Sequence, residues 1–181
     1  ELAVIGSGDV LSGIISSLVG KNKLNSFDAS CAGVWIHSEI GKKSGIGLIA
    51  EDLIKQLKTL SKKNENIILG GDFNIIPSAE DVYNPKSFED DALFRLEIRK
   101  KLREIINIGF HDAYRHINND KEGYTFWDYM RGAWQKNNGM RIDHFLVSNS
   151  LLNIIKDVKI NKYPRGKEKP SDHTPIEIEL A

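Results

Sequence analysis

Two polar residues at the end of an apolar run could act together on one reacting group. Asp72 and Asn74 lie two positions apart, just past a buried-strand pattern at 66–69. In an extended chain, residues i and i+2 point to the same side, so a carboxylate and an amide would face one substrate atom. Aspartate and asparagine are also common turn residues. Taken alone, the pair favours a plain turn at the strand end, and shared chemistry is the alternative.

A carboxylate inside an apolar segment is the second candidate. Asp143 stands in the apolar run 141–147, where it is unfavourable unless it is paired or hydrogen-bonded. It could pair with Arg141, bond to the backbone, or orient a histidine. His173 supplies such a histidine on a loop before the last predicted strand, and a carboxylate-supported imidazole is a common acid/base or electrostatic unit. Asp172 beside it offers the hard oxygen ligands that suit Mg²⁺. Taken singly, each of these residues favours a structural role.

The elements that would position these residues follow from local patterns in the second part of the chain. Segment 88–107 predicts a helix, because its first turn is acidic, its later turns are basic, and Gly109 would end it. Its apolar stripe would comprise Phe94, Ile98, Leu102 and Ile105. Apolar and alternating runs predict strands at 66–69, 124–128, 141–147, 158–163 and 176–180.

The first part of the chain predicts a strand at 2–5 and helices at 9–19, 26–40 and 49–62. Gly6, Ser7 and Gly8 precede the first helix, whose free backbone N–H groups would form an anion site. The spacing is not the dinucleotide-binding fingerprint, because the third glycine is missing. A simple turn at the start of a helix is the alternative interpretation.

Composition narrows the class of protein. The 181 residues are 40% hydrophobic and 28% charged, which is ordinary globular usage and excludes collagen-like or disordered chains. The net charge of zero excludes a strongly basic coat protein for nucleic acid. No apolar run approaches the length of a membrane span. The single cysteine excludes an internal disulfide, so we expect a reducing cytoplasmic location. Because the sequence starts at Glu1, we also expect a cut or fragmentary chain.

Four motifs in order carry a family resemblance: Gly-Asp-Phe-Asn at 71–74, Tyr-Thr-Phe-Trp-Asp-Tyr at 124–129, Asn-Asn-Gly-Met-Arg-Ile-Asp at 137–143 and Pro-Ser-Asp-His at 170–173. Segments 81–85 and 109–115 add to it. Together, 64–180 resembles the exonuclease III and apurinic/apyrimidinic endonuclease family. That family belongs to the metal-dependent endonuclease/exonuclease/phosphatase phosphodiesterases. The resemblance implies a DNA repair nuclease.

The resemblance also implies roles for individual side chains. Asp72 would activate or align the attacking water, and Asn74 would position the water or the phosphate. Asp143 would hold His173, which would contact the phosphate. These roles suit phosphodiester hydrolysis, in which a water must be aligned and a developing oxyanion stabilised.

Three further residues complete the implied site. Asp172 would help to bind Mg²⁺ or Mn²⁺, Asn84 would contact a DNA phosphate, and Phe126 would line an apolar pocket for the abasic sugar. The implied substrate is DNA with an abasic site or a 3′ end, and no membrane is involved. Within this set, we expect Asp143 and His173 to be hydrogen-bonded. We expect the whole acidic set to converge at one end of a sheet.

Departures from the family qualify this expectation. The family has a metal-binding Glu, an Asn and a catalytic Tyr in its N-terminal half, and no segment before residue 64 resembles those motifs. Glu39 and Glu51 stand in the wrong context, and Met140 replaces a frequent Trp. We therefore expect the C-terminal half of a two-sheet α/β sandwich, with an exposed apolar face. A fragment carrying the missing half is a possible partner, and the isolated chain should be weakly active or inactive.

The first part resembles a different enzyme. Segments 6–15, 27–37 and 47–54 look like the C-terminal end of the nucleotide-dependent NAD(P)H-hydrate dehydratases, which have a ribokinase-like α/β fold. By that resemblance, Gly6, Ser7 and Gly8 would cradle a phosphate of ATP or ADP, and Asp9 would be the catalytic acid/base. We therefore expect a mostly helical fragment at 1–62 joined to the nuclease half at 63–181, with Gly6–Asp9 apart from the nuclease cluster.

Two alternatives to a nuclease stay open. The chain could be a remnant of NAD(P)H-hydrate dehydratase, for which Asp9 and the phosphate turn are the remaining chemistry. It could also be a non-catalytic remnant that binds DNA through Arg115, Arg131, Lys136 and the loop 162–169. A charged loop of this kind is usually solvated surface.

Overall fold

The computed structural model describes residues 58–59, 66–119 and 122–181. The strand predicted at 2–5, the helices predicted at 9–19 and 26–40, and the Gly6–Asp9 site lie outside the described residues. Of the helix predicted at 49–62, only Lys58 and Thr59 are described, and both are helical. No helix in the described part of the chain is long and apolar enough to cross a membrane.

In the described residues, five strands form two antiparallel sheets. The first sheet has the order β1-β3-β2 and comprises β1 (Ile68–Asp72), β2 (Phe110–Asp112) and β3 (Asp143–Ser148). The second sheet pairs β4 (Ile155–Ile160) with β5 (Ile176–Leu180). In the register of β1 and β3, Asp72 lies opposite Asp143. The pairing therefore brings two residues of the predicted site to the same end of the first sheet.

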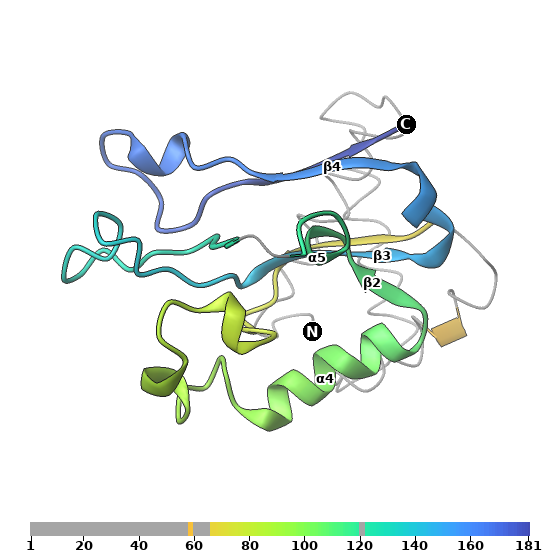
Figure 1. The fold of residues 1–181 in the computed structure, drawn as a ribbon, viewed down its shortest axis with the longest axis horizontal. Helices are drawn as coiled ribbons and strands as arrows, with labels where there is room; N and C mark the ends of the chain where they lie inside the picture. Colours follow the sequence, from red (N-terminus) through yellow and green to blue (C-terminus); the bar gives the residue numbers. More distant parts are fainter. Residues whose placement is uncertain (1–57, 60–65, 120–121) are drawn as a thin grey trace, which may run out of the picture.

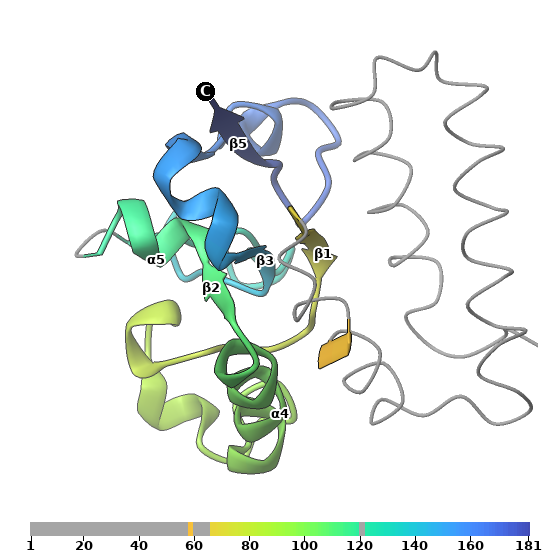
Figure 2. The same cartoon turned by 90° about the vertical axis from the view of Figure 1, so that its right-hand side faces the viewer.

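The three-stranded sheet lies between the two-stranded sheet and helix α4 (Leu96–Asn107), as Figures 1 and 2 show from two directions. Between the two sheets, Val147 of β3 packs with Val158 of β4, and Ile178 of β5 packs against this cluster. On the opposite face, Leu102 of α4 packs with Phe110 and Leu146. Both faces of the β1-β3-β2 sheet are thus covered by apolar side chains, which accounts for its mixed α/β character.

Short helices connect the strands. Helix α5 (Ala113–Ile117) follows β2 directly, and the Asp112 side chain caps it by accepting a hydrogen bond from the backbone N–H of Arg115 at 3.1 Å. Further short helices of the 3₁₀ type lie at Ala79–Asp81, Pro85–Phe88, Asn149–Ile154 and Pro164–Gly166. The first two of these helices follow the end of β1 that carries Asp72, whereas the Asn149–Ile154 helix follows the end of β3 that is remote from Asp143.

The start of the helix predicted at 88–107 is wrong, because α4 begins only at Leu96. Asp91 was expected in an acidic first turn, but its side chain accepts the N–H of Leu93 at 2.8 Å and holds a turn. Phe94 is buried against a separate cluster around Ile76, so its side chain leaves the helix stripe. Ile98 is also 37% exposed rather than packed. The predicted end is confirmed, since Gly109 follows the helix with a φ of +106°.

The strand predicted at 124–128 is also wrong. This segment contributes only isolated bridges, through Phe126 to Met140 and to His173. The strand predicted at 141–147 is confirmed with a shift, because pairing begins at Asp143 and leaves Arg141 before the ladder. The strand predicted at 158–163 starts earlier, at Ile155, and its ladder ends at Ile160 because Pro175 precedes the partner strand.

Candidate active site

The end of β1 holds an aspartate and an asparagine in direct contact. Asn74 has a φ of +52°, so the chain leaves the extended conformation there. Its backbone N–H donates to one carboxylate oxygen of Asp72 at 2.8 Å, and its side-chain amide donates to the other at 3.0 Å. The turn interpretation of this motif is therefore confirmed, and the extended geometry is wrong. The two groups still meet, because the turn folds the amide back onto the carboxylate.

The carboxylate of β3 lies against the predicted histidine. Oδ2 of Asp143 is 2.9 Å from Nδ1 of His173, which confirms the expected hydrogen bond. The alternative pairing of Asp143 with Arg141 is wrong, because Arg141 bonds to other carboxylates. The second ring nitrogen, Nε2, lies 3.9 Å from Oδ2 of Asp72. The imidazole therefore stands between two carboxylates that come from neighbouring strands.

These carboxylates change the acidity of the imidazole. The hydrogen bond to Asp143 raises the pKa of His173, and the charges of Asp143, Asp72 and Asp172 add to this rise against the opposing effect of burial. The side chain of His173 is 33% exposed, so the ring is open to solvent. With Nδ1–H donated to Asp143, the Nε2 atom is the one that can face a substrate.

A ladder of single bridges joins distant segments around this pair. Val82 bridges to Met140, Met140 to Phe126, and Phe126 to His173. The Phe126 ring meets the imidazole edge-on, with the ring centroids 5.0 Å apart. Phe126 therefore lies beside His173, where an apolar wall for a sugar was expected.

Asp172 and Asn84 connect to the pair more loosely. The backbone carbonyl of Asp172 accepts the N–H of Trp127 at 2.9 Å, and its side chain accepts a 3.4 Å hydrogen bond from Ser171. Asn84 is exposed at the start of the Pro85–Phe88 helix, two positions past Val82 of the bridge ladder. Direct contacts thus bring together five members of the predicted set, namely Asp72, Asn74, Phe126, Asp143 and His173. Asp172 joins through its backbone and Asn84 through the ladder.

The described residues do not form a complete metal site. Among them, no group of three or more His, Cys, Asp or Glu side chains could hold a metal ion. Asp172 and Asp72 offer the oxygen donors that Mg²⁺ prefers, but two carboxylates leave most of its coordination to water or substrate. The role of Asp172 as a metal ligand therefore stays a prediction.

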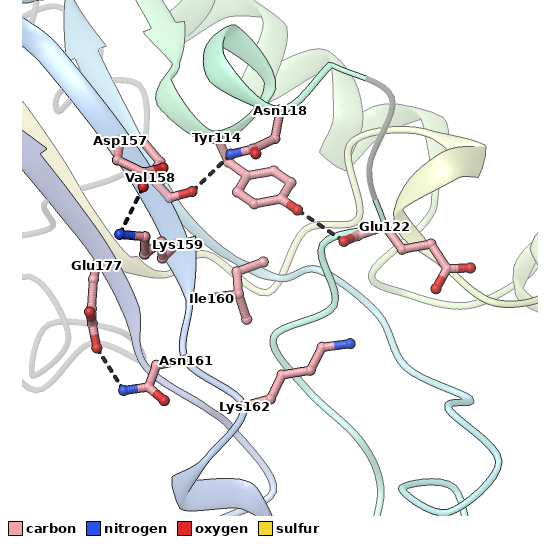
Figure 3. Close-up of a pocket in the computed structure, with 10 residues that line it drawn as sticks. All are labelled: Tyr114, Asn118, Glu122, Asp157, Val158, Lys159, Ile160, Asn161, Lys162 and Glu177. Atoms are coloured by element: carbon pink, nitrogen blue, oxygen red, sulfur yellow. Dashed lines mark hydrogen bonds and ion pairs between the residues drawn. The ribbon is translucent and has the colours of Figure 1, made fainter.

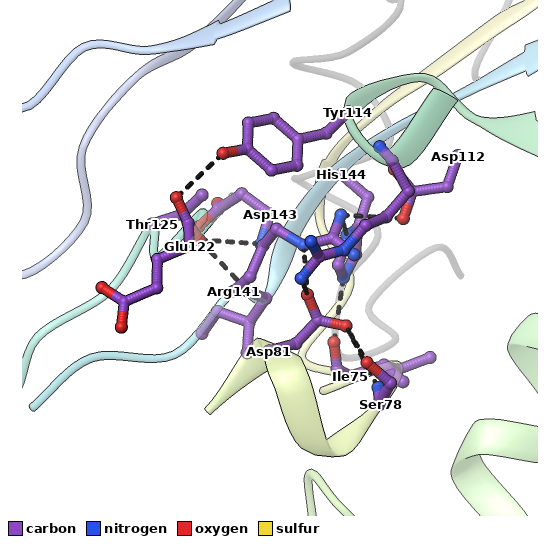
Figure 4. A network of polar contacts seen from close by, with 12 residues as sticks. Ile75, Ser78, Asp81, Asp112, Tyr114, Glu122, Thr125, Arg141, Asp143 and His144 are labelled. Carbon is purple, nitrogen blue, oxygen red and sulfur yellow. Dashed lines mark hydrogen bonds and ion pairs between the residues drawn. The ribbon is translucent and has the colours of Figure 1, made fainter. Parts of the chain in front are cut away.

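A second polar network was not predicted, and Figure 4 shows it around the fully buried Arg141. The Nε atom of Arg141 donates to Asp81 at 2.7 Å, and an Nη atom donates to Asp112 at 2.8 Å. Arg115 also pairs with Asp81, at 2.6 Å, so two cations balance two carboxylates. Burial acts to raise the pKa of Asp81, but the charge of Arg141 and the hydrogen bonds from Arg141, Arg115 and Ser78 hold it below its usual value.

His144 completes the buried network. Its Nδ1 lies 3.1 Å from an Nη atom of Arg141, and its Nε2 lies 2.9 Å from the carbonyl of Ile75. Arginine can only donate, so Nδ1 accepts and Nε2–H donates to the carbonyl, which assigns the neutral tautomer. Complete burial and the charge of Arg141 lower the pKa of His144 to about 4. A buried arginine in an apolar run signals a need for carboxylates, but it does not identify them.

This network includes Arg115, one of the residues predicted to contact DNA. Arg115 is half-buried, pairs with Asp81 and donates to the carbonyl of Asn119, so it serves the interior. In the loop 162–169, the ammonium of Lys162 lies 5.3 Å from the centre of the Trp127 ring. Lys136 donates to the carbonyl of Arg131 at 3.0 Å.

A cavity of about 580 Å³ lies between α5 and β4, and Figure 3 shows its lining. Among the described residues, none of those predicted for the nuclease site lines it. Two of the lining side chains are already hydrogen-bonded within the protein. The Tyr114 hydroxyl donates to the carbonyl of Glu122, and the Asn118 amide donates to the carbonyl of Val158. The charged residues in the lining are of both signs, namely Glu122, Asp157, Glu177, Lys159 and Lys162. The cavity is therefore a separate feature from the Asp143–His173 pair, and neither of those residues lines it.

Comparison with known proteins places this geometry in context. The chain is 37% identical over 129 residues to an exodeoxyribonuclease of Bacillus subtilis, a match that covers 71% of this chain and 49% of the relative. It is 40% identical over 113 residues to a DNA-(apurinic or apyrimidinic site) endonuclease of Dictyostelium discoideum, covering 62% of this chain and 30% of that protein. The structure resembles a 3′-5′ exonuclease from Neisseria meningitidis with a TM-score of 0.70 and 30% identity, over 72% of this chain and 51% of that one.

The chain thus spans about half or less of the length of these relatives. At its N-terminal end, residues 1–63 match the family model of NAD(P)H-hydrate dehydratase. Residues 46–173 match the model of the endonuclease/exonuclease/phosphatase family, whose nucleases are generally dependent on divalent metals. The two matches overlap at 46–63. With most of its length in the second match, and with the fold of a solved exonuclease, this chain belongs to the endonuclease/exonuclease/phosphatase family.

Proposed function

We propose that this chain carries one half of a metal-dependent DNA phosphodiesterase centre of the exonuclease III and AP endonuclease type. The observation that carries the proposal is the imidazole of His173, held by Asp143 at 2.9 Å with Asp72 at 3.9 Å on its other side. Two carboxylates of neighbouring strands and one open imidazole are a suitable set for hydrolysing a phosphodiester.

The chain's own residues divide the chemistry as follows. Asp143 keeps the proton on Nδ1 of His173, and the raised pKa favours a protonated ring whose Nε2–H donates to a phosphate oxygen. Asp72, with its carboxylate fixed by Asn74, accepts a proton from the attacking water. One oxygen atom to the side of the 3.9 Å line could contact both Nε2 and Asp72 at a hydrogen-bond distance of about 2.8 Å.

We propose the metal ion from the chemistry of the side chains, and DNA as the substrate from the names of the relatives. Mg²⁺ or Mn²⁺ would neutralise charge on the phosphate, with Asp172 as a ligand and the remaining ligands supplied from outside the described residues. DNA is the proposed substrate because the relatives are named as nucleases that act on DNA or on abasic sites. Phe126, edge-on to His173, would border an abasic sugar, and the exposed Asn84 would contact a flanking phosphate.

A second polypeptide is part of the proposal. The chain spans 49% of the Bacillus subtilis relative. A partner that supplies the other half of the family's fold would add the ligands that the described residues lack. Alone, the chain should cleave DNA weakly or not at all, since losing even one preorganised group can reduce the rate ~10²–10³-fold.

NAD(P)H-hydrate dehydratase is the second candidate, and the match of residues 1–63 favours it. Gly6, Ser7 and Gly8 would bind a phosphate of ATP or ADP, and Asp9 would act as the acid/base; all four lie outside the described residues. A non-catalytic DNA-binding remnant is weakened by the inward pairing of Arg115 with Asp81.

One set of assays distinguishes the three candidate functions: nuclease, dehydratase and non-catalytic DNA-binding remnant. The full chain is incubated with abasic-site DNA and Mg²⁺ or Mn²⁺, alone and with the part of the Bacillus subtilis exodeoxyribonuclease that precedes its matched half. We expect cleavage only in the mixture. DNA binding without cleavage in the mixture would support the remnant instead. ATP- or ADP-dependent loss of the absorbance of hydrated nicotinamide would support the dehydratase.

A further inference from the structure

Thr125 is a fully buried residue beneath the start of β3. Its hydroxyl oxygen accepts hydrogen bonds from the backbone N–H groups of Ile142 and Asp143, each at 3.1 Å. The hydroxyl thus binds the backbone of Asp143 directly, at the place where this strand begins. The Thr125 hydroxyl thus accepts two backbone N–H groups that a neighbouring strand would otherwise pair.

The backbone of Thr125 also binds the segment that carries His173, the partner of Asp143. Its N–H donates to the carbonyl of Met140 at 2.9 Å, and its carbonyl accepts the N–H of Thr174 at 2.8 Å. Thr174 directly follows His173. A single buried residue therefore fixes the chain on both sides of an Asp143–His173 contact whose members lie 30 positions apart.

A second hydrogen bond to the backbone of His173 is local. Ser171 accepts the N–H of His173 at 3.1 Å, but it is exposed and belongs to the same loop. That contact shapes the loop and does not connect it to β3. Long-range support of the loop comes from Thr125, through Thr174, and from Trp127, whose N–H donates to the carbonyl of Asp172 at 2.9 Å. Of these two residues, Thr125 is the one whose side chain also binds the backbone of Asp143.

We propose that Thr125 is a positioning residue whose hydroxyl sets the Asp143–His173 hydrogen bond. Valine has nearly the same shape but cannot accept a hydrogen bond, so it would leave two buried N–H groups without their acceptor. Residues 142–143 would then shift toward other acceptors and carry the Asp143 carboxylate with them. The catalytic importance of this support rests on the proposed function, whereas the geometry does not.

The test compares three variants of the full chain. Thr125→Val removes the hydroxyl, and Thr125→Ser keeps it while removing the methyl group. Thr174→Val is the matched control, because it removes another buried threonine hydroxyl, one that donates to the carbonyl of Asn161 and does not touch Asp143. Crystal structures give the Nδ1–Oδ2 distance, and the low-field proton resonance of His173 Nδ1–H reports the bond in solution.

We expect Thr125→Val to lengthen the Nδ1–Oδ2 distance from 2.9 Å to beyond ~3.5 Å and to lose the low-field resonance. Thr125→Ser and Thr174→Val should retain both. An unchanged pair in Thr125→Val, or a lost pair in Thr174→Val, would overturn the proposal. If Thr125→Val does not fold, Thr125→Ser still decides, because a lost pair there would assign the support to the methyl group. No DNA is used, so a failure of the proposed function leaves this test intact.

Discussion

Asp143 and His144 are consecutive residues of β3, and they belong to opposite kinds of site. Asp143 holds a partly exposed histidine, whose pKa is raised by the carboxylates around it. His144 is fully buried against Arg141, and its pKa is lowered to about 4. Because side chains alternate across a strand, consecutive residues face different surroundings. Asp143 belongs to an open site with His173 and Asp72, and His144 belongs to a closed frame around Arg141. Each site contains an imidazole: that of His173 is partly open to solvent beside Asp143, whereas that of His144 is enclosed beside Arg141.

The largest effect should come from breaking the closed frame. Arg141→Met removes the cation shared by the buried Asp81 and the partly buried Asp112, and it leaves Asp81 with Arg115. Losing one partner of a buried pair destabilises a protein by about 3–5 kcal/mol. Urea unfolding followed by circular dichroism measures the change, and a loss below about 1 kcal/mol would show that the frame is not a structural centre.

The buried histidine should make stability depend on acid. The unfolded chain has the ordinary histidine pKa of 6.5, whereas the folded value is about 4, so the unfolded state binds the proton first as the pH falls. Stability should therefore be complete above pH 6.5 and decrease toward pH 4, by on the order of 3 kcal/mol. His144→Gln, which stays neutral and can still donate and accept, should flatten this dependence. Equal slopes for both proteins between pH 6.5 and pH 4 would refute the assignment.

The open histidine should respond in the opposite direction. Its raised pKa stabilises the folded chain below the ordinary histidine pKa, and that contribution disappears as the pH rises through the folded value. Asp143→Asn should lower the pKa of His173, as an NMR titration of the ring would report. Solvent screens a ring that is 33% exposed, so the change in stability should be smaller than for His144. Asp157→Asn, at a surface pair with Lys159, is the control and should leave the titration unchanged.

The smallest effect should come from an exposed pair outside both sites. Lys101 and Glu104 face solvent on α4 with their charged atoms 3.3 Å apart. Lys101→Met should change the free energy of unfolding by less than about 0.5 kcal/mol. The same urea experiment measures it, and a change as large as that of Arg141→Met would remove the distinction between buried and exposed charge.

The open site was largely predictable from the sequence. A carboxylate in an apolar strand needs a partner, and the order of the motifs indicated His173 as that partner. The two strands that pair Asp72 with Asp143 also followed from apolar runs, with bounds within three residues of those observed. What could not be predicted was the contact itself between Asp72 and Asn74, since it depends on a positive φ at Asn74.

The closed frame could not be predicted, because its partners are distant in sequence. Arg141 and Asp81 lie 60 positions apart, and no local charge pattern relates them. The start of α4 was missed for a similar reason, since Phe94 leaves the helical stripe to pack with Ile76. Local patterns identify what a residue needs, whereas the fold determines which partner meets that need.

Cleavage of abasic-site DNA by the complemented chain tests most directly whether the open site performs the chemistry. The full chain and its His173→Ala and His144→Gln variants are each mixed with the preceding half of the Bacillus subtilis exodeoxyribonuclease at pH 7.5 with Mg²⁺. We expect cleavage by the unaltered chain and by His144→Gln, and at least a ~10²-fold loss for His173→Ala. Equal cleavage by His173→Ala and the unaltered chain, or an equal loss in both variants, would contradict the division between an open catalytic face and a closed structural one.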